Sequence, residues 1–278
     1  MKEDGGIPCR VAQRFGEILL REEICRLRDE RKVLILVHCD EPDAVKGTAD
    51  RVGDDISLLL AAAASGAGEL VVCAPRAVAE TVQLLLPDAR VILPVPDSTC
   101  PQDPEVSPED LRAARREHPR AALVIDVRSP VESKALADIT CTLATFTEVV
   151  ESLEEEEVIV ALPGLDPDTL PEAWAGEKGI LAIPLRSAGG VEGRPDSGAR
   201  HAHPGGTAEE SALPENGVGK GGFFPRHCTI CHGMRQTTLH DLYRSLVTGE
   251  SRVEIPGSLF PAARRPVLRM MDVLGWRP

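Results

Sequence analysis

The stretch that decides the fold is residues 33–42, Val33-Leu-Ile-Leu-Val-His-Cys-Asp-Glu-Pro42. Five consecutive aliphatic residues before a polar end are typical of a strand that is covered on both faces, as in a parallel sheet. A helical stripe over 11–31 precedes this strand, and a helix at about 54–65, with Gly66 as its stop, follows it. We therefore expect the strand to open an α/β layer.

The alternation of strands and helices continues and then repeats. The first set continues with strands at 70–73 and 90–93 around a helix at 76–86. The second set begins with a helix capped by Ser107, with Pro108 at its first position. Its other members are strands at 121–127, 158–162 and 179–185 and helices at about 131–137, 144–153 and 168–175. The predicted fold class is α/β, with repeated three-layer modules: two complete, plus a reduced C-terminal part.

Five segments are predicted along the chain. They are an N-terminal helix (1–31), two α/β domains (32–104 and 105–186), a Gly-rich flexible linker (187–226) and a C-terminal metal-binding segment with helices (227–278). The 36 residues of 187–222 include ten Gly and three Pro, so they bury too little apolar surface to offset the entropy of ordering. Two helices are expected after them, from Thr237 or Thr238 to Gly249 and over about 260–274.

Charge and hydropathy exclude several classes of function. The 278 residues carry 31 Lys and Arg against 44 Asp and Glu, a net charge of −13, without a basic block. Such a chain is a poor partner for nucleic acid or an anionic membrane. Its apolar runs are too short to span a bilayer, and its first residues lack the pattern of a secretory signal. We expect a cytoplasmic protein.

The cysteines point to metal chemistry rather than to disulfides. The chain has eight, at positions 9, 25, 39, 73, 100, 141, 228 and 231. Cys228 and Cys231 form a C-x-x-C pair, whose thiolates can bind zinc, copper(I) or an iron–sulfur centre. A haem attachment site, which needs export, and a metal-free pair are the other interpretations. A cluster needs a further donor, and Cys100, just beyond a predicted strand, is the natural one.

Polar residues at predicted strand ends are the other candidates. His38 ends the first strand beside Asp40 and Glu41, where a ligand or a structural role is open. Asp54-Asp55 can cap the following helix. Arg128-Ser129 follows a strand of the second module, where Arg128 either holds a carboxylate or phosphate or is exposed in a turn.

Several motifs in the same order resemble the quinolinate synthase family. The resemblance covers about 32–186 and 228–275. The matching segments are Ile35–His38, Ala49–Asp54, Ala79–Val82, Ser98–Pro101, Glu132–Asp138, Cys141-Thr142, Cys231–Arg235 and Pro266–Leu274. It implies three similar α/β domains around a pseudo-threefold axis, with one cysteine from each holding a 4Fe–4S cluster. One iron of that cluster stays open as a Lewis acid and helps to condense iminoaspartate with dihydroxyacetone phosphate to quinolinate, a step of NAD biosynthesis.

The resemblance also implies roles for individual residues. Cys100 and Cys231 match two cluster ligands, and His38 matches the substrate-site histidine, which we expect to be catalytic. No cysteine stands at 184–191, where the family has its middle ligand, so Cys228 is the predicted third ligand. The Gly-rich stretch replaces the family's third domain, so this is a shortened, divergent member lacking most of that domain.

The site itself also departs from the family. Asp40 and Arg128 replace a tyrosine and an asparagine, Asp55 and Leu143 replace serines, and Asp126 replaces a tyrosine. The residues predicted to bind a small carboxylate or phosphate substrate are Asp40, Asp55, Arg128, Ser129 and Thr142. Because the added carboxylates repel a dianion, a second interpretation stays open. It is a non-catalytic homologue that binds an iron–sulfur cluster or zinc and acts on a partner protein.

Overall fold

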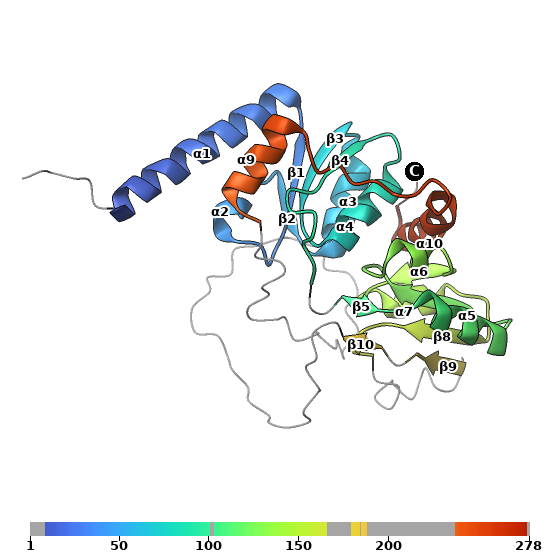
Figure 1. Cartoon of the computed structure of the whole chain (residues 1–278). Coiled ribbons are helices and arrows are strands. Elements are labelled where there is room, and N and C mark those ends of the chain that lie inside the picture. The colour runs from blue at the N-terminus through green and yellow to red at the C-terminus, as the bar shows by residue number, and fades with distance from the viewer. Residues whose placement is uncertain (1–8, 101–102, 166–178, 184, 188–236, 277–278) are drawn as a thin grey trace, which may run out of the picture.

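The structure of the chain is a computed structural model, and it describes residues 9–100, 103–165, 179–183, 185–187 and 237–276 (Figure 1). These residues form two parallel four-stranded sheets with helices on their faces, which confirms the predicted α/β class. The predicted helix at 168–175 and nearly all of the predicted linker lie outside the described residues.

Both sheets have the same topology. In strand order, the first is β2 (Arg51–Gly53), β1 (Leu34–His38), β3 (Glu69–Cys73) and β4 (Arg90–Ile92). The second is β7 (Ile139–Cys141), β6 (Ala122–Asp126), β8 (Glu157–Ala161) and β9 (Gly179–Ala182). In each, the first strand of the module lies between the second and the third, and all neighbours are parallel. A short antiparallel pair, β5 (Pro104–Glu105) with β10 (Arg186–Ser187), lies beside the second sheet.

Most helices of the modules lie where the sequence predicts them, but the helix at Asp43–Lys46 was not predicted, and the helix predicted over about 131–137 ends at Lys134. In the first module they are α2 (Asp43–Lys46), α3 (Asp55–Ser65) and α4 (Arg76–Leu85); in the second they are α5 (Pro108–Glu117), α6 (Val131–Lys134) and α7 (Phe146–Glu151). Asp54 caps α3 by accepting the Ser57 amide, and Ser107 caps α5 in the same way. Gly66 ends α3 with φ 62°, a left-handed conformation that glycine adopts without strain.

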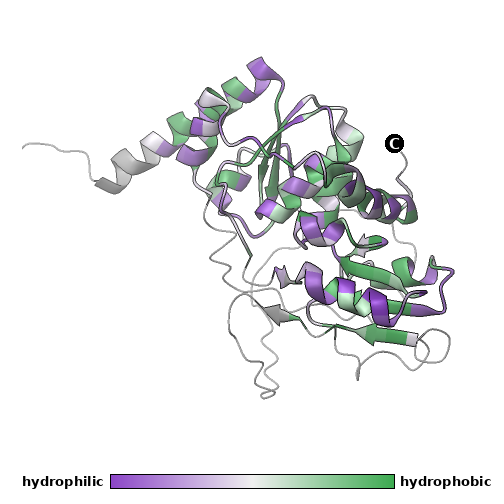
Figure 2. Ribbon diagram, turned by 45° about the vertical axis from the view of Figure 1, so that its right-hand side comes forward, coloured by the Kyte–Doolittle hydropathy of each residue, from purple (hydrophilic) through white to green (hydrophobic). Residues whose placement is uncertain are grey.

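Each sheet is covered on both faces. In β1, Ile35 and Val37 pack toward α1 (Cys9–Arg31) and α9 (Leu239–Thr248), while Leu36 packs toward α3 and α4. In β6, Leu123 and Ile125 pack toward α5, and Val124 packs toward α7 and α10 (Phe260–Val273). Figure 2 shows hydrophobic strands covered by helices that carry both hydrophilic and hydrophobic residues. The three-layer arrangement follows from this alternation.

The two C-terminal helices complete the modules that precede them. Thr238 and Asp241 form a capping box at the start of α9, which lies beside α1 (Figure 1). The α10 helix packs against α4, α6 and β7, so its buried Val267 and Met270 lie in a core shared by both modules. In the part of the chain that the structure describes, these two helices are not accompanied by a third four-stranded sheet. No described helix is long and apolar enough to cross a membrane.

An aspartate repeats at equivalent places in the two modules. Asp50 accepts the Ile35 amide at 2.8 Å, and Asp138 accepts the Leu123 amide at 2.8 Å. Each also pairs with an arginine, Arg28 in the first module and Arg115 in the second. The repetition of both contacts supports two modules built on one plan.

Candidate active site at the carboxyl ends of the sheets

The site is built on equivalent positions of the two modules. His38 ends β1 in register with Gly53, and Asp126 ends β6 in register with Cys141. In both modules the amide two residues later turns back to this side chain. The Asp40 amide lies 3.2 Å from His38 Nδ1, and the Arg128 amide donates to Asp126 Oδ1 at 2.7 Å. The carboxyl ends of parallel strands are where α/β folds place ligands.

His38 is buried between two carboxylates, with 6% of its surface exposed. Its Nε2 lies 3.4 Å from Asp55 Oδ1, and its Nδ1 lies 3.9 Å from both Asp40 Oδ2 and the Cys39 sulfur. Burial lowers the pKa of His38, but the contacts with Asp55 and Cys39 outweigh it and raise this pKa to about 10. Because the Asp40 N–H points toward Nδ1, it disfavours a proton on that nitrogen. The ring therefore holds the proton on Nε2, which faces Asp55, more strongly than a proton on Nδ1.

Arg128 joins the two modules. Its Nε lies 3.3 Å from Asp126 and 3.6 Å from Asp55, and its Nη1 lies 3.7 Å from Asp103. The same Nη1 lies 3.8 Å from the sulfur of Cys100. Burial lowers the pKa of Arg128, but these carboxylates outweigh it and raise this pKa further. A continuous set of contacts therefore runs from His38 through Asp55 and Arg128 to Cys100.

Asp103 is a member of this set that the sequence analysis missed. It accepts the Cys100 amide at 2.9 Å and so shapes the turn that presents the cysteine. Burial raises its pKa to about 6, against the opposing effects of the Cys100 amide and Arg128. The signal was an aspartate three residues after a cysteine, since such side chains bond nearby backbone amides in turns.

Acidic groups dominate the site. Asp40, Asp55, Asp103 and Asp126 surround the guanidinium of Arg128 and the ring of His38. Asp126 is 3% exposed, and its burial raises its pKa. One oxygen of Asp55 and one of Asp103 make no hydrogen bond among the described residues. The site therefore has acceptor capacity to spare and few donors.

Two predicted substrate residues differ in their placement. Ser129 is fully buried, and its hydroxyl has no hydrogen-bond partner among the described residues. Thr142 lies just past β7, where its hydroxyl and amide both bond Thr145, at 3.2 and 3.0 Å. The described contacts therefore join Arg128 to Asp55 and Cys100, but they do not join Thr142 to this set.

The C-terminal part of the chain returns to the loop after His38. The hydroxyl of Thr237 donates to Glu41 at 2.9 Å, although the two residues are 196 positions apart. Glu41 is 2% exposed, and burial raises its pKa to about 7. The predicted ligands Cys228 and Cys231 lie outside the described residues. No local pattern indicates the contact with Thr237, because it depends on the tertiary fold.

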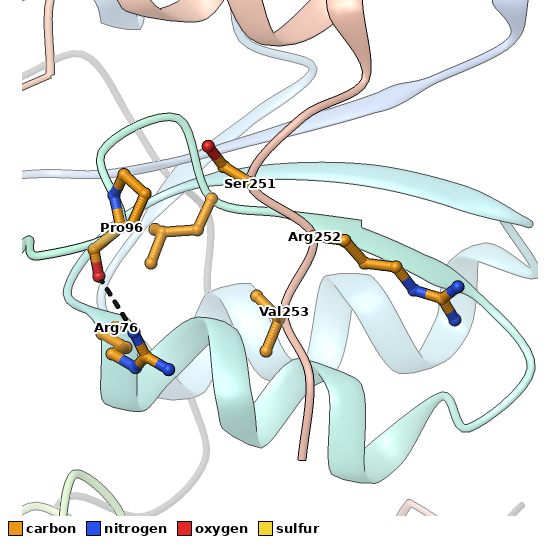
Figure 3. Close-up of a pocket in the computed structure, with 6 residues that line it drawn as sticks. Arg76, Pro96, Ser251, Arg252 and Val253 are labelled. Atoms are coloured by element: carbon orange, nitrogen blue, oxygen red, sulfur yellow. Dashed lines mark hydrogen bonds between the residues drawn. The ribbon is translucent and has the colours of Figure 1, made fainter.

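A separate hollow is too small for a substrate. It measures about 40 Å³ and is lined by Arg76, Leu93, Pro96, Ser251, Arg252 and Val253 (Figure 3). Arg76 points its guanidinium to the Pro96 carbonyl and pairs with Glu80. This volume holds a few water molecules.

Comparison with known proteins agrees with the order of motifs. The family described as "NadA: Quinolinate synthetase A protein" matches residues 22–168. The quinolinate synthase of Methanoregula boonei is 33% identical over 302 residues, covering 91% of this chain and 98% of that protein. The enzyme of the same name from Methanothermobacter thermautotrophicus is 29% identical, with the same coverage. Quinolinate synthase 2 of Methanosarcina acetivorans is 40% identical over 141 residues, 51% of this chain and 46% of that protein.

The alignment with the Methanoregula protein extends over more positions than this chain has residues, so the relative contains residues without a counterpart here. The matched segment, residues 22–168, includes the histidine, the cysteine and the arginine that the contacts bring together. On the family match and this near-complete coverage, the chain belongs to the quinolinate synthase family.

Proposed function

We propose that this chain is an iron–sulfur protein of the quinolinate synthase type that condenses iminoaspartate with dihydroxyacetone phosphate to quinolinate. The observation that carries the proposal is the continuous contact from His38 through Asp55 and Arg128 to Cys100. It places a histidine, a cation and a cysteine on one edge formed by both modules. These are the groups that proton transfer, anion binding and metal ligation require.

The surroundings of Cys100 suit a cluster ligand. Cys100 is 5% exposed, and its sulfur lies 3.8 Å from Nη1 of Arg128, a cation that can balance the negative charge of a metal-bound sulfur. We assign Cys100, Cys228 and Cys231 as the ligands of a 4Fe–4S cluster. Cys231 is six residues before Thr237, which is anchored to Glu41, so the chain holds it within about 20 Å of that anchor. When bound, the cluster supplies a Lewis-acidic iron.

The protein's own groups have separable roles in this proposal. His38, whose pKa of about 10 keeps the ring protonated at neutral pH, donates a proton from Nδ1, while Asp55 balances the positive charge of the ring from the Nε2 side. Arg128 and the buried hydroxyl of Ser129 bind carboxylate or phosphate oxygens of the substrate. To do so, Arg128 must exchange part of its contact with Asp55 or Asp103 for the substrate.

The difficulty of freeing Arg128 from its carboxylates favours a second candidate function. Three carboxylates already lie within 4 Å of the Arg128 guanidinium, and they repel a dianionic substrate. A non-catalytic homologue that holds a cluster or zinc and acts on a partner protein needs no such exchange. In that case the carboxylates keep Arg128 paired permanently.

The test is quinolinate formation by the anaerobically purified full chain, supplied with iminoaspartate and dihydroxyacetone phosphate. We expect product from the parent chain and a loss of at least 100-fold in kcat/KM in His38→Asn and in Cys100→Ser. Lys32→Met, at an exposed position just before β1, is the matched control and should keep full activity. A chain that carries its cluster but forms no quinolinate would establish the second candidate instead.

A further inference from the structure

Three adjacent residues at the end of β1 bring together ligand atoms of three kinds. One ligand atom each from His38, Cys39 and Asp40 lies within 4.8 Å of the others. His38 Nδ1 is 3.9 Å from the Cys39 sulfur and 3.9 Å from Asp40 Oδ2. We propose that these residues form a mononuclear site for a divalent ion of the zinc type, distinct from the cluster assigned to Cys100.

The spacing is close to that of a tetrahedral site. Zinc bonds of about 2.0 Å to nitrogen and oxygen and about 2.3 Å to sulfur place neighbouring ligand atoms about 3.3 to 3.7 Å apart. The two separations from His38 Nδ1, both 3.9 Å, exceed this by a few tenths of an ångström, and all three ligand atoms lie within 4.8 Å of one another, so side-chain rotation can bring them together. The backbone of the loop is already fixed, since the Cys39 amide bonds Gly53 and the Glu41 amide bonds His38.

The ring of His38 is oriented for such an ion. The Asp40 amide N–H approaches Nδ1 at 3.2 Å, which weakens the hold of that nitrogen on a proton, so that a divalent ion can displace the proton and bind there. On the other side, Nε2 faces Asp55 Oδ1, an oxygen without a hydrogen bond of its own. Histidine ligands commonly donate their second ring N–H to a carboxylate, which fixes the ring and strengthens the metal bond.

The donor set selects the ion. A thiolate with an imidazole nitrogen favours zinc and related transition metals over magnesium or calcium, which prefer oxygen. The two anionic ligands neutralise the charge of the ion. Cys39 and Asp40 are only partly buried, so the ion can reach them from solvent. Three protein ligands leave a fourth position for water, as in catalytic rather than structural zinc sites.

Two carboxylates that stand where the family has other residues both serve the proposed metal site. Asp40 becomes a ligand and Asp55 becomes the outer carboxylate, one on each side of the same ring. The ion would occupy Nδ1, the nitrogen to which we assign proton transfer. Zinc bound here would therefore inhibit the proposed condensation, although the site itself does not depend on that function.

The test uses the full-length chain carrying Cys228→Ser and Cys231→Ser, which removes the competing thiolate pair, and titrates it with Co²⁺ alone. We expect one equivalent to produce a thiolate-to-cobalt charge-transfer band in the near ultraviolet and d–d bands in the visible. Cys39→Ser should abolish the charge-transfer band, and Asp55→Asn should weaken binding by about 10- to 100-fold. Cys25→Ser, a change of the same kind at another partly buried cysteine, should change nothing.

A second readout keeps the test valid if these variants fold poorly. In the unmodified chain, stoichiometric Zn²⁺ should protect Cys39 from alkylation by iodoacetamide, as measured by peptide mass spectrometry, and leave Cys25 unprotected. A cobalt band that survives Cys39→Ser, or alkylation of Cys39 that zinc does not slow, would overturn the site. Because neither readout needs a cluster or quinolinate formation, failure of the proposed function would leave both results interpretable.

Discussion

The first module ends its first strand with His38 and Asp40, whereas the second ends the equivalent strand with Asp126 and Arg128. The backbone is alike at both ends, because in each case the amide two residues later bonds the strand-end side chain. The chemistry is opposite: a ring beside an acid in one module and an acid beside a guanidinium in the other.

This difference separates the residues that hold the strands in place, which we call the framework, from the residues that form the site. The framework repeats, with Asp50 and Asp138 holding the first strand of each module through the same contact. The site depends on the positions that do not repeat, since contact between Asp55 of one module and Arg128 of the other joins the two ends. A substitution in the framework should therefore lower the free energy of unfolding equally in both modules. Substitutions at the two strand ends should have unequal effects.

The largest expected effect comes from Arg128→Met. The variant leaves Asp55, Asp103 and Asp126 without the guanidinium that pairs with all three, and we expect a loss of about 3 to 5 kcal/mol in the free energy of unfolding. Urea unfolding at pH 7 measures it. The equivalent change in the first module, Asp40→Asn, should cost less than about 1 kcal/mol because Asp40 is one-third exposed. Equal costs would show that the two strand ends are not distinct.

Lys134→Met should stabilise the chain. Lys134 is fully buried on α6, where it donates to Thr81 of the other module at 2.7 Å, and burial lowers its pKa to about 8. Keeping it charged below pH 8 costs about 3 kcal/mol, part of which its hydrogen bond offsets. We expect Lys134→Met to gain about 2 kcal/mol at pH 7.

The pH dependence of this effect has a definite sign. Between pH 8 and 10.5 the unfolded chain keeps the Lys134 proton that the folded chain releases, so stability should rise with pH in this window. Lys134→Met should abolish that rise, as followed by urea unfolding at several pH values. Lys32→Met, which removes an exposed lysine, should change neither stability nor slope. A destabilised, pH-sensitive Lys134→Met chain would contradict the assignment.

The repeated aspartates offer a test of equality. Asp50→Asn and Asp138→Asn each weaken a charge-assisted bond to a strand amide and an arginine pair, so each should cost about 2 kcal/mol. Chemical unfolding of the two variants should give values within about 0.5 kcal/mol of each other. A large difference between them would mean that the modules do not share one framework.

The smallest effect is expected at the helix caps. Asp54→Ala at α3 and Ser107→Ala at α5 each remove a side chain that accepts an amide of the first turn, which costs about 1 kcal/mol. Thermal unfolding monitored by circular dichroism should resolve both losses. Asp54→Asn keeps the acceptor oxygen and should restore nearly all of the stability at α3.

Much of the fold could be predicted because its signals are local. Caps and glycine stops defined the ends of α3, α5 and α9, and apolar runs defined β1 and β6. The three-residue strands β2 and β7 were missed, because so short a segment has no measurable period. The short helices α2 and α6 end after one turn, where the sequence analysis omitted the first and overextended the second.

The site could be predicted only where it follows from topology. The strand-end rule placed His38 and Arg128 each at the carboxyl edge of its own module, and the structure joins them through Asp55. Asp103 and Thr237 were missed, because their partners are set by a turn and by a contact across the whole chain. The roles of all the predicted site residues stay predictions.

The most direct test of the central proposal is the absorption spectrum, with the iron and sulfide content, of the anaerobically purified chain. We expect a brown protein with equal iron and sulfide, bleached by dithionite, whose colour is lost in each of Cys100→Ala, Cys228→Ala and Cys231→Ala. A colourless chain, or one whose only metal is zinc that depends on Cys228 and Cys231 but not on Cys100, would contradict it.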